Sequence, residues 1–294
     1  MGDNQLTTAQ IKELLQGISI PPQPQIMVDL QMEQMDDNCS IDSITRLIMQ
    51  DIGLCGSILK TVNSPFFGLS DKITSVHQAI SLLGIATVVN LVNSLSIRSS
   101  LSDDKIIKMT RFWDSAMDVA VVSAAISKDI GLASPDEAYM FGLFHNCGNM
   151  LMLSRFETFP SVVVESYAIE ERRIVDVENE VFNTNHCVVG YYVSTAWNLP
   201  NYISEAIQDH HSVDDIFANT NYKNSRKKNL LAILKMAENI CETYQTLGEQ
   251  TSDYEWSRLE ASVLDHVGLS TYDYTTLKEN IEDQSITSGF NSMD

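Results

Sequence analysis

The feature that most constrains the fold is a strongly apolar run from Tyr139 to Phe156. Its apolar side chains recur with the three-to-four-residue spacing of a helix: Met140, Leu143, Phe144, Cys147, Leu151 and Met152. The run follows a helix start signal at 134–137, where a serine, a proline and two acidic residues stand in order. A helix this apolar is predicted to be buried, so His145 and Asn146 within it need polar partners.

Helical signals of the same kind cover most of the chain, and the sequence shows no strand pair, no glycine-rich phosphate loop and no repeat. The longest predicted helices end at caps or at glycine and proline, and they cover about 85–101, 103–130, 139–156 and 226–246. We therefore predict an all-α fold. It is a multi-helix bundle with an N-terminal helical lobe and extra helices toward the C-terminal end.

The charge balance disfavours two classes of partner. The 294 residues include 39 acidic and 19 basic side chains, and the formal net charge is −20. Nucleic acids and anionic membranes would repel such a chain, so neither is expected as a partner. The first residues lack a signal peptide pattern, no apolar run approaches about 20 residues, and the five cysteines show no CxxC spacing. These features predict a cytoplasmic protein with reduced thiols.

Four of the six histidines fall between positions 145 and 211. A helix, a Leu-Pro turn and a second helix are predicted between His186 and His210, and an antiparallel pair of this kind can bring its two ends together. His145, His186 and either His210 or His211 are therefore predicted to converge on one pocket. Clustered imidazoles suit a transition metal when a neighbour holds the second nitrogen of each ring.

Three interpretations of this region remain open from the residues alone. His145 and Asn146 form either a hydrogen-bonded pair in the core or the remnant of a metal site. Cys147 and Cys187 each lie next to or near a histidine, so a His-Cys zinc site is the third interpretation.

Together with motifs in the first third of the chain, the histidine pattern resembles the HDOD proteins, signalling relatives of the metal-dependent HD phosphohydrolases. The matching segments are Ile-Pro-Pro-Gln-Pro at 20–24, residues 51–62, Asn-Ser-Pro-Phe-Phe-Gly at 63–68, residues 73–84, Phe-Trp at 112–113, Gly-Leu-Phe-His-Asn at 142–146, Asn-His at 185–186, Gly190, Trp-Asn-Leu-Pro at 197–200 and His-His at 210–211. The resemblance covers about residues 18–215 and implies an HD-like bundle.

The resemblance also predicts how the chain is divided. We expect an N-terminal helical extension at 1–17 and an HDOD domain at 18–216. Within that domain, an N-terminal helical lobe is expected at about 18–102 and an HD-like lobe at about 103–216. A C-terminal helical extension would then cover 217–294.

The same comparison implies that active-site groups are missing. Catalytic HD enzymes carry a histidine near the place of Ser115 and an aspartate at the place of Asn146, which has no negative charge to hold a divalent metal. Hydrolysis by a metal-activated water is therefore not expected, and we predict no catalytic residue and no cofactor. The predicted vestigial pocket comprises His145, Asn146, Ser115, His186, His210 and His211. Any metal would be a divalent transition metal held by His145, His186, His210 and His211.

Two aromatic residues follow the predicted helix stop at Asn63-Ser64-Pro65. They would either plug a core or form a surface anchor for a partner protein. On the second interpretation the candidate partner-contact residues are Asn63, Phe66 and Phe67.

Three functions fit this pattern. The favoured one, which the resemblance implies, is a non-catalytic signal-transduction module that contacts signalling proteins in trans in a bacterial cytoplasm. The second is a divergent metal-dependent phosphohydrolase in which Glu178 or Glu180 replaces the lost carboxylate. The third is a sensor that binds a nucleotide or small anion in the vestigial pocket. No feature of the sequence specifies an oligomeric state.

Overall fold

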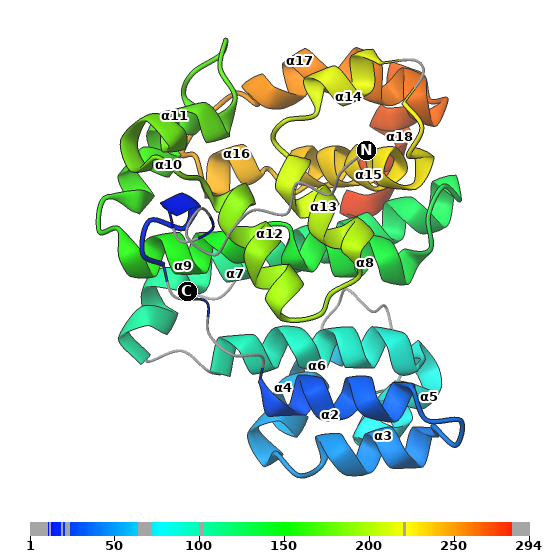
Figure 1. Ribbon diagram of the computed structural model, residues 1–294. Helices are drawn as coiled ribbons and strands as arrows, with labels where there is room; N and C mark the ends of the chain where they lie inside the picture. Colours follow the sequence, from blue (N-terminus) through cyan, green and yellow to red (C-terminus); the bar gives the residue numbers. More distant parts are fainter. Residues whose placement is uncertain are drawn as a thin grey trace. The chain divides into compact units, whose positions relative to one another are not determined.

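The computed structural model is helical wherever it has regular structure among the residues it describes, which confirms the all-α prediction (Figure 1). These residues are 11, 13–18, 20, 24–63, 72–99, 103–219 and 222–283. Within them, no helix is both long enough and apolar enough to cross a membrane.

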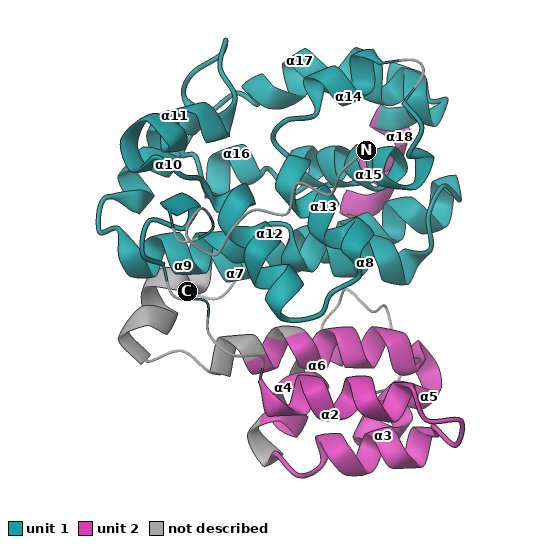
Figure 2. Cartoon of the chain, viewed as in Figure 1, with its two compact units in different colours: residues 1–21, 109–274 teal, residues 22–108, 275–294 magenta. Residues whose placement is uncertain are grey.

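The chain forms two compact units (Figure 2). Unit 1 comprises residues 1–21 and 109–274, and unit 2 comprises residues 22–108 and 275–294. The segment from 217 to 274 therefore belongs to the same unit as the predicted HD-like lobe.

Unit 2 is built from helices of 8 to 15 residues, three of which begin at side-chain caps. Its helices are α2 (Gln25–Gln34), α3 (Ile41–Ile48), α4 (Ile52–Val62), α5 (Val76–Leu83) and α6 (Ile85–Ser99). Ser40, Asp51 and Ser75 accept a backbone N–H at the starts of α3, α4 and α5, which satisfies donors that a helix leaves unpaired. Helix α2 packs against α3 and α6, and its Met27 and Leu30 are fully buried (Figure 1).

Asn63 closes the end of α4 with three hydrogen bonds. Its side-chain amide donates to the carbonyls of Leu59 and Ile73, both at 2.8 Å, and its oxygen accepts from the Ile73 N–H at 2.7 Å. This candidate partner-contact residue therefore has its polar atoms engaged inside unit 2. The other two candidates, Phe66 and Phe67, lie outside the described residues.

Unit 1 contains most of the longer helices. They are α8 (Pro135–Phe144), α9 (Cys147–Arg155), α10 (Phe159–Tyr167), α11 (Ile174–Phe182), α12 (His186–Ala196), α13 (Asn201–Asp209), α14 (Asp214–Ala218), α15 (Ser225–Ile240), α16 (Thr243–Thr246) and α17 (Tyr254–Val267). Two further helices, α7 (Asp103–Ile130) and α18 (Thr271–Asp283), contain residues of both units. Helix α12 packs against α9 and α13, and α15 packs against α8, α13 and α17.

The predicted continuous helix from 139 to 156 is wrong, because the chain breaks at His145 and Asn146. In an unbroken helix the carbonyl of Gly142 would accept the backbone N–H of Asn146. Here the Nδ1 atom of His145 lies 2.5 Å from that carbonyl. The imidazole thus competes with the backbone for one acceptor, and the backbone of Asn146, with φ −101° and ψ 18°, leaves the helical conformation. The predicted helix at 226–246 also divides, at Glu242, whose φ of 52° is left-handed.

Glycine allows α9 and α12 to approach closely. A Cβ atom on Gly148 would lie 2.0 Å from the carbonyl oxygen of His186 and 2.8 Å from the nitrogen of Gly190. Only a residue without a side chain leaves room for this crossing. The crossing places the start of α12, where His186 lies, against the chain that follows His145 and Asn146.

Substituting Gly148 tests whether the crossing is essential. We expect Gly148→Ala to lower the free energy of unfolding by about 3 kcal/mol or more, since the added methyl group overlaps backbone atoms that cannot move independently. Chemical denaturation followed by circular dichroism measures the change. Gly56→Ala is the control, because Gly56 lies in α4 with open space around it, and alanine there should stabilise the helix by about 0.5–1 kcal/mol. A Gly148 variant as stable as the wild type would contradict the close approach.

Candidate functional site

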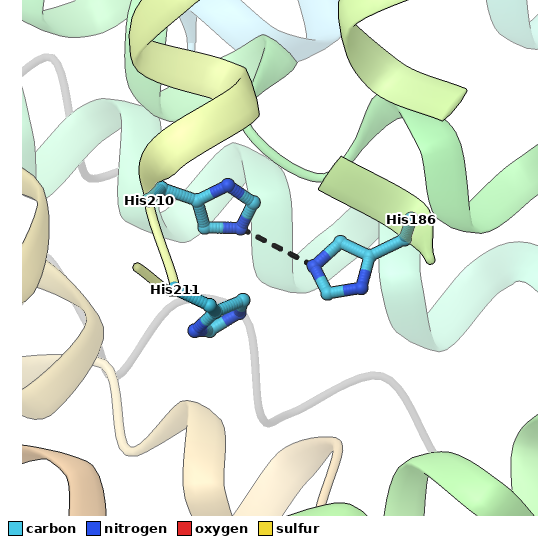
Figure 3. A group of neighbouring side chains, drawn as sticks. All are labelled: His186, His210 and His211. Carbon is cyan, nitrogen blue, oxygen red and sulfur yellow. Dashed lines mark hydrogen bonds between the residues drawn. The ribbon is translucent and has the colours of Figure 1, made fainter. Parts of the chain in front are cut away.

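Four histidines lie together in the core of unit 1. His145 follows the end of α8, His186 begins α12, and His210 and His211 follow α13. Neighbouring ring centroids are 4.3–5.3 Å apart, and no more than 2% of any of the four residues is exposed. Figure 3 shows the imidazoles of His186, His210 and His211, which come from α12 and the end of α13 and lie close together. The structure therefore brings together the four histidines between positions 145 and 211.

Each of these rings is held through its Nδ1 atom. The oxygen that Nδ1 faces is, in chain order, the carbonyl of Gly142 at 2.5 Å, Glu178 at 2.8 Å, the carbonyl of Ile207 at 2.7 Å and Glu255 at 2.8 Å. Because these oxygens accept hydrogen bonds, each Nδ1 carries a proton. The Nε2 atom of each ring is left for contacts inside the cluster, which is the arrangement that second-sphere groups impose on metal-binding histidines.

Glu178, His186 and His210 form a continuous hydrogen-bonded chain. Glu178 is fully buried and also accepts the backbone N–H of His186 at 2.8 Å, so its carboxylate lies at the start of α12. The Nε2 atoms of His186 and His210 are 3.3 Å apart (Figure 3). One of the two must therefore donate to the other if both are to be satisfied.

The pKa shifts identify His186 as the donor. Burial opposes its charge, but Cys187 and Glu178 outweigh burial and hold the pKa of His186 well above its usual value. Burial also raises the pKa of Cys187, and the adjacent His186 opposes that rise. Burial and the neighbouring His211 hold the pKa of His210 well below its usual value. A charged His186 therefore donates to a neutral His210.

His145 and Asn146 form a hydrogen-bonded pair. Burial lowers the pKa of His145 to about 3, so the ring is neutral and its Nε2 atom is an acceptor. The amide nitrogen of Asn146 donates to that atom at 2.7 Å. The lone pair that a metal would require at His145 is therefore engaged by an N–H group.

Three charged residues that the sequence analysis did not identify complete the cluster. Lys235 and Glu238 lie on α15, and Glu255 lies on α17. The Nζ atom of Lys235 is 2.7 Å from Glu238 and 2.9 Å from Glu255, and Glu238 is 3.5 Å from the Nε2 atom of His145. The available sequence signal was a lysine and a glutamate three residues apart in the otherwise apolar stretch 230–238.

These charges perturb one another. Burial opposes the charge of Lys235, but Glu238 and Glu255 outweigh it and raise the pKa of Lys235 above its usual value. Burial raises the pKa of Glu238 to about 7, against the opposing effect of Lys235. Lys235 is thus a permanent cation in the core.

The other candidate residues have different surroundings. Ser115 is buried on α7, and its hydroxyl has no hydrogen-bond partner among the described residues. Of the two glutamates proposed to replace the lost carboxylate, Glu178 contacts His186, whereas Glu180 pairs with Arg172 at the surface. The Cys147 thiol faces the carbonyl of Gly190 at 3.6 Å.

Cys187 lies 3.6 Å from Nε2 of His186, but its position beside His210 does not suit a zinc ion shared with His210. Its Sγ atom is 3.4 Å from Nδ1 of His210 and 3.9 Å from Nε2. A zinc ion bound at Nε2 would lie on the far side of the ring from Nδ1, so a sulfur ligand would be nearer to Nε2. The geometry disfavours the His-Cys zinc interpretation at this ring.

Two groups of donors can be tested for a metal. The side-chain nitrogens of His186, His210 and His211 lie within 4.8 Å of one another, and the 3.3 Å between two of them is close to the spacing of about 3.3 Å for nitrogens around tetrahedral zinc. The spacing of this group fits a transition metal, and binding one would require His186 to lose the proton that it shares with His210. The second group is His145, His210 and Glu238. It does not fit, because Asn146 engages the nitrogen of His145 and Lys235 engages Glu238.

Comparisons with known proteins agree with this description. The family model of the HDOD domain matches residues 20–213, which confirms the resemblance in the sequence. Among solved structures, the chain is similar to an HDOD domain protein from Geobacter sulfurreducens, with 21% identity, a TM-score of 0.72 and 97% of each chain covered. It is also similar to a candidate phosphohydrolase from Shewanella amazonensis SB2B, with 17% identity, a TM-score of 0.66 and 96% of each chain covered. At these identities the likeness shows the fold.

The chain is also similar to part of a longer curated relative. An uncharacterized protein of Treponema pallidum (strain Nichols) is 24% identical over 201 residues, which are 66% of this chain. The match spans 38% of that relative's length.

The buried neutral histidines predict a specific pH effect. His210 is held neutral in the folded chain, whereas in the unfolded chain it takes up a proton below a pH of about 6.5. Its contribution to stability is therefore present above that pH and is lost as the pH falls. His210→Gln is expected to lower the free energy of unfolding relative to wild type. We expect this loss to become smaller by about 1.4 kcal/mol for each pH unit below about 6.5.

The quantity to compare across pH is the difference in free energy of unfolding between His210→Gln and wild type. Buried carboxyls such as Asp118, whose pKa burial raises to about 8, change the total pH dependence in the opposite direction. His77→Gln is the control, because His77 is an exposed residue paired with Asp42 outside the cluster. A cost for His210→Gln that stays constant between pH 7.5 and 5.5 would show that His210 is not held neutral.

Proposed function

The chain belongs to the HDOD family, and we propose its function on that basis. In this proposal the protein is a non-catalytic signal-transduction module of a bacterial cytoplasm, and it acts through contacts with signalling proteins in trans. The observation that carries the proposal is the burial and internal hydrogen bonding of the histidine cluster.

Hydrolysis by an HD-type centre requires a metal-bound water that can reach a phosphoester. The four histidines of the cluster are at least 98% buried, so a substrate at the surface of the described residues would not contact them. The carboxylate expected beside His145 is replaced by Asn146, whose amide donates to the imidazole. Both features support a structural role for the cluster, in which it holds α8, α12, α13 and α15 together.

The same burial disfavours the sensor interpretation. A small cavity borders the cluster at Glu255, and Tyr167, Arg172 and Arg258 also line it. Its volume is about 10 Å³, which is room for about one water molecule. A nucleotide would not fit there.

Whether the module uses a metal depends on the side-chain nitrogens of His186, His210 and His211. We propose that the wild-type module needs no metal for its activity, because hydrogen bonds already engage the Nε2 atoms of His145, His186 and His210. A divalent transition metal, where one is bound, would be held by His186, His210 and His211. This group is also the observation that favours the second candidate function, a divergent phosphohydrolase.

Unit 2 offers the more apolar surface for a partner. Among the described residues, its large apolar side chains that are more than half exposed are Met32, Met35, Met49 and Leu82. Methionine side chains adapt their shape and are common on surfaces that bind other proteins. We propose that this unit makes the main partner contact.

An activity assay tests the non-catalytic proposal. Protein supplied with Mn²⁺, Fe²⁺ or Zn²⁺ is expected to hydrolyse neither bis(p-nitrophenyl) phosphate nor cyclic dinucleotides above the rate with metal alone. The physical reason is that the cluster is closed to substrate and lacks the aspartate at 146. Turnover that His186→Ala abolishes and His77→Ala leaves unchanged would instead establish the phosphohydrolase.

Site-specific crosslinking tests the partner contact. A photoreactive amino acid at Met49 or Leu82 is expected to capture a defined partner protein in cells of the source bacterium. The same group at Val181 is the control, because Val181 is similarly exposed but belongs to unit 1. Equal capture from all three positions, or from Val181 alone, would contradict unit 2 as the contact surface.

A further inference from the structure

We infer that Lys235 is a built-in cation that takes the place of a bound metal ion in this pocket. Its ammonium group lies among side chains that would otherwise serve as metal ligands, namely Glu238, Glu255 and His211. The inference goes beyond the proposed function, because it concerns what neutralises the pocket and not what the module contacts.

The position of the ammonium group is the first argument. Its Nζ atom is 2.7 Å from Glu238, 2.9 Å from Glu255 and 3.3 Å from the Nδ1 atom of His211. Only 3% of Lys235 is exposed, so solvent does not compete for these contacts. An ammonium group donates several hydrogen bonds and so suits a site where two carboxylates, Glu238 and Glu255, lie within reach as acceptors.

Charge is the second argument. Glu238 and Glu255 are two carboxylates at the edge of the same neutral histidines, His145 and His211. Removing such anions from water is unfavourable unless a cation lies close by. Among the described residues, Lys235 is the lysine or arginine that contacts both of them.

The chemistry of the donors is the third argument. Carboxylate oxygens and imidazole nitrogens are the common ligands of divalent transition metals. A metal would draw these atoms to about 2.0–2.2 Å, whereas the ammonium group holds them at hydrogen-bond distances. Since the two cations would repel each other at this range, Lys235 and a metal exclude one another.

The place of Lys235 in the chain is the fourth argument. It lies on α15, which begins after the segment that the HDOD family model matches. The helices beyond that segment thus supply the cation to a pocket whose histidines lie within it. The contacts of α15 and α17 with the histidine cluster accord with the place of the segment 217–274 in unit 1.

Removing the charge tests the inference. Lys235→Ala is expected to bind about one more equivalent of Co²⁺ per chain than wild type, with visible absorption of the bound ion as a second readout. Metal content is measured by elemental analysis after gel filtration of the full chain. The double variant Lys235→Ala, Glu238→Gln should return to the wild-type metal content, because it removes a donor as well.

Lys227→Ala is the matched control. Lys227 is also a buried lysine of α15, but it pairs with one carboxylate, Asp209, and contacts no imidazole in the described structure. This variant is expected to bind no additional metal. Lys235→Gln, which removes the charge and keeps hydrogen-bonding capacity, provides the same comparison if the alanine variant is insoluble.

Two outcomes would overturn the inference. One is that neither variant of Lys235 binds more Co²⁺ than wild type. The other is that Lys227→Ala gains as much metal as Lys235→Ala, which would indicate general loosening of α15. Neither outcome depends on hydrolysis or on partner capture, so the inference can fail while the proposed function stands.

Discussion

The need to neutralise buried anions is the constraint on which unit 1 depends. Glu178 has a protonated His186 beside it, and Glu238 and Glu255 have Lys235 between them. Removing either cation would leave an isolated charge in the core, which typically costs about 3–5 kcal/mol. The first pair joins α11 to α12, and the second group joins α15 to α17. The contacts of Glu238 with His145 and of Glu255 with His211 then link these helices to elements that are distant in the chain.

The start of α12 and the glycine at position 148 determine where the charged side chains of the cluster lie. Glu178 lies at the start of α12, where the exposed N–H groups of the helix favour an anion. The missing side chain at Gly148 lets α9 approach that same helix end, so His145 and His186 come within one cluster. The hydrogen bonds of the histidines therefore depend on the close packing of the α9 and α12 backbones as well as on the side chains of the cluster.

The sequence predicted the fold class and the convergence of the histidines, because both depend on local spacing. Helical periodicity is visible in a single chain, and the turn between α12 and α13 brings His186 back toward His210. The break at His145 was not predictable, since it depends on an imidazole competing for one carbonyl oxygen. Lys235, Glu238 and Glu255 were missed because their partners are distant in sequence and because α15 and α17 lie outside the recognised segment.

A cation that is part of the polypeptide cannot dissociate. With Lys235 in the role inferred above, the pocket would keep its charge balance when free zinc or iron in the cell becomes scarce, because the charges of Lys235 and His186 belong to side chains. The order of unit 1 would then depend on the chain itself and not on the supply of a metal.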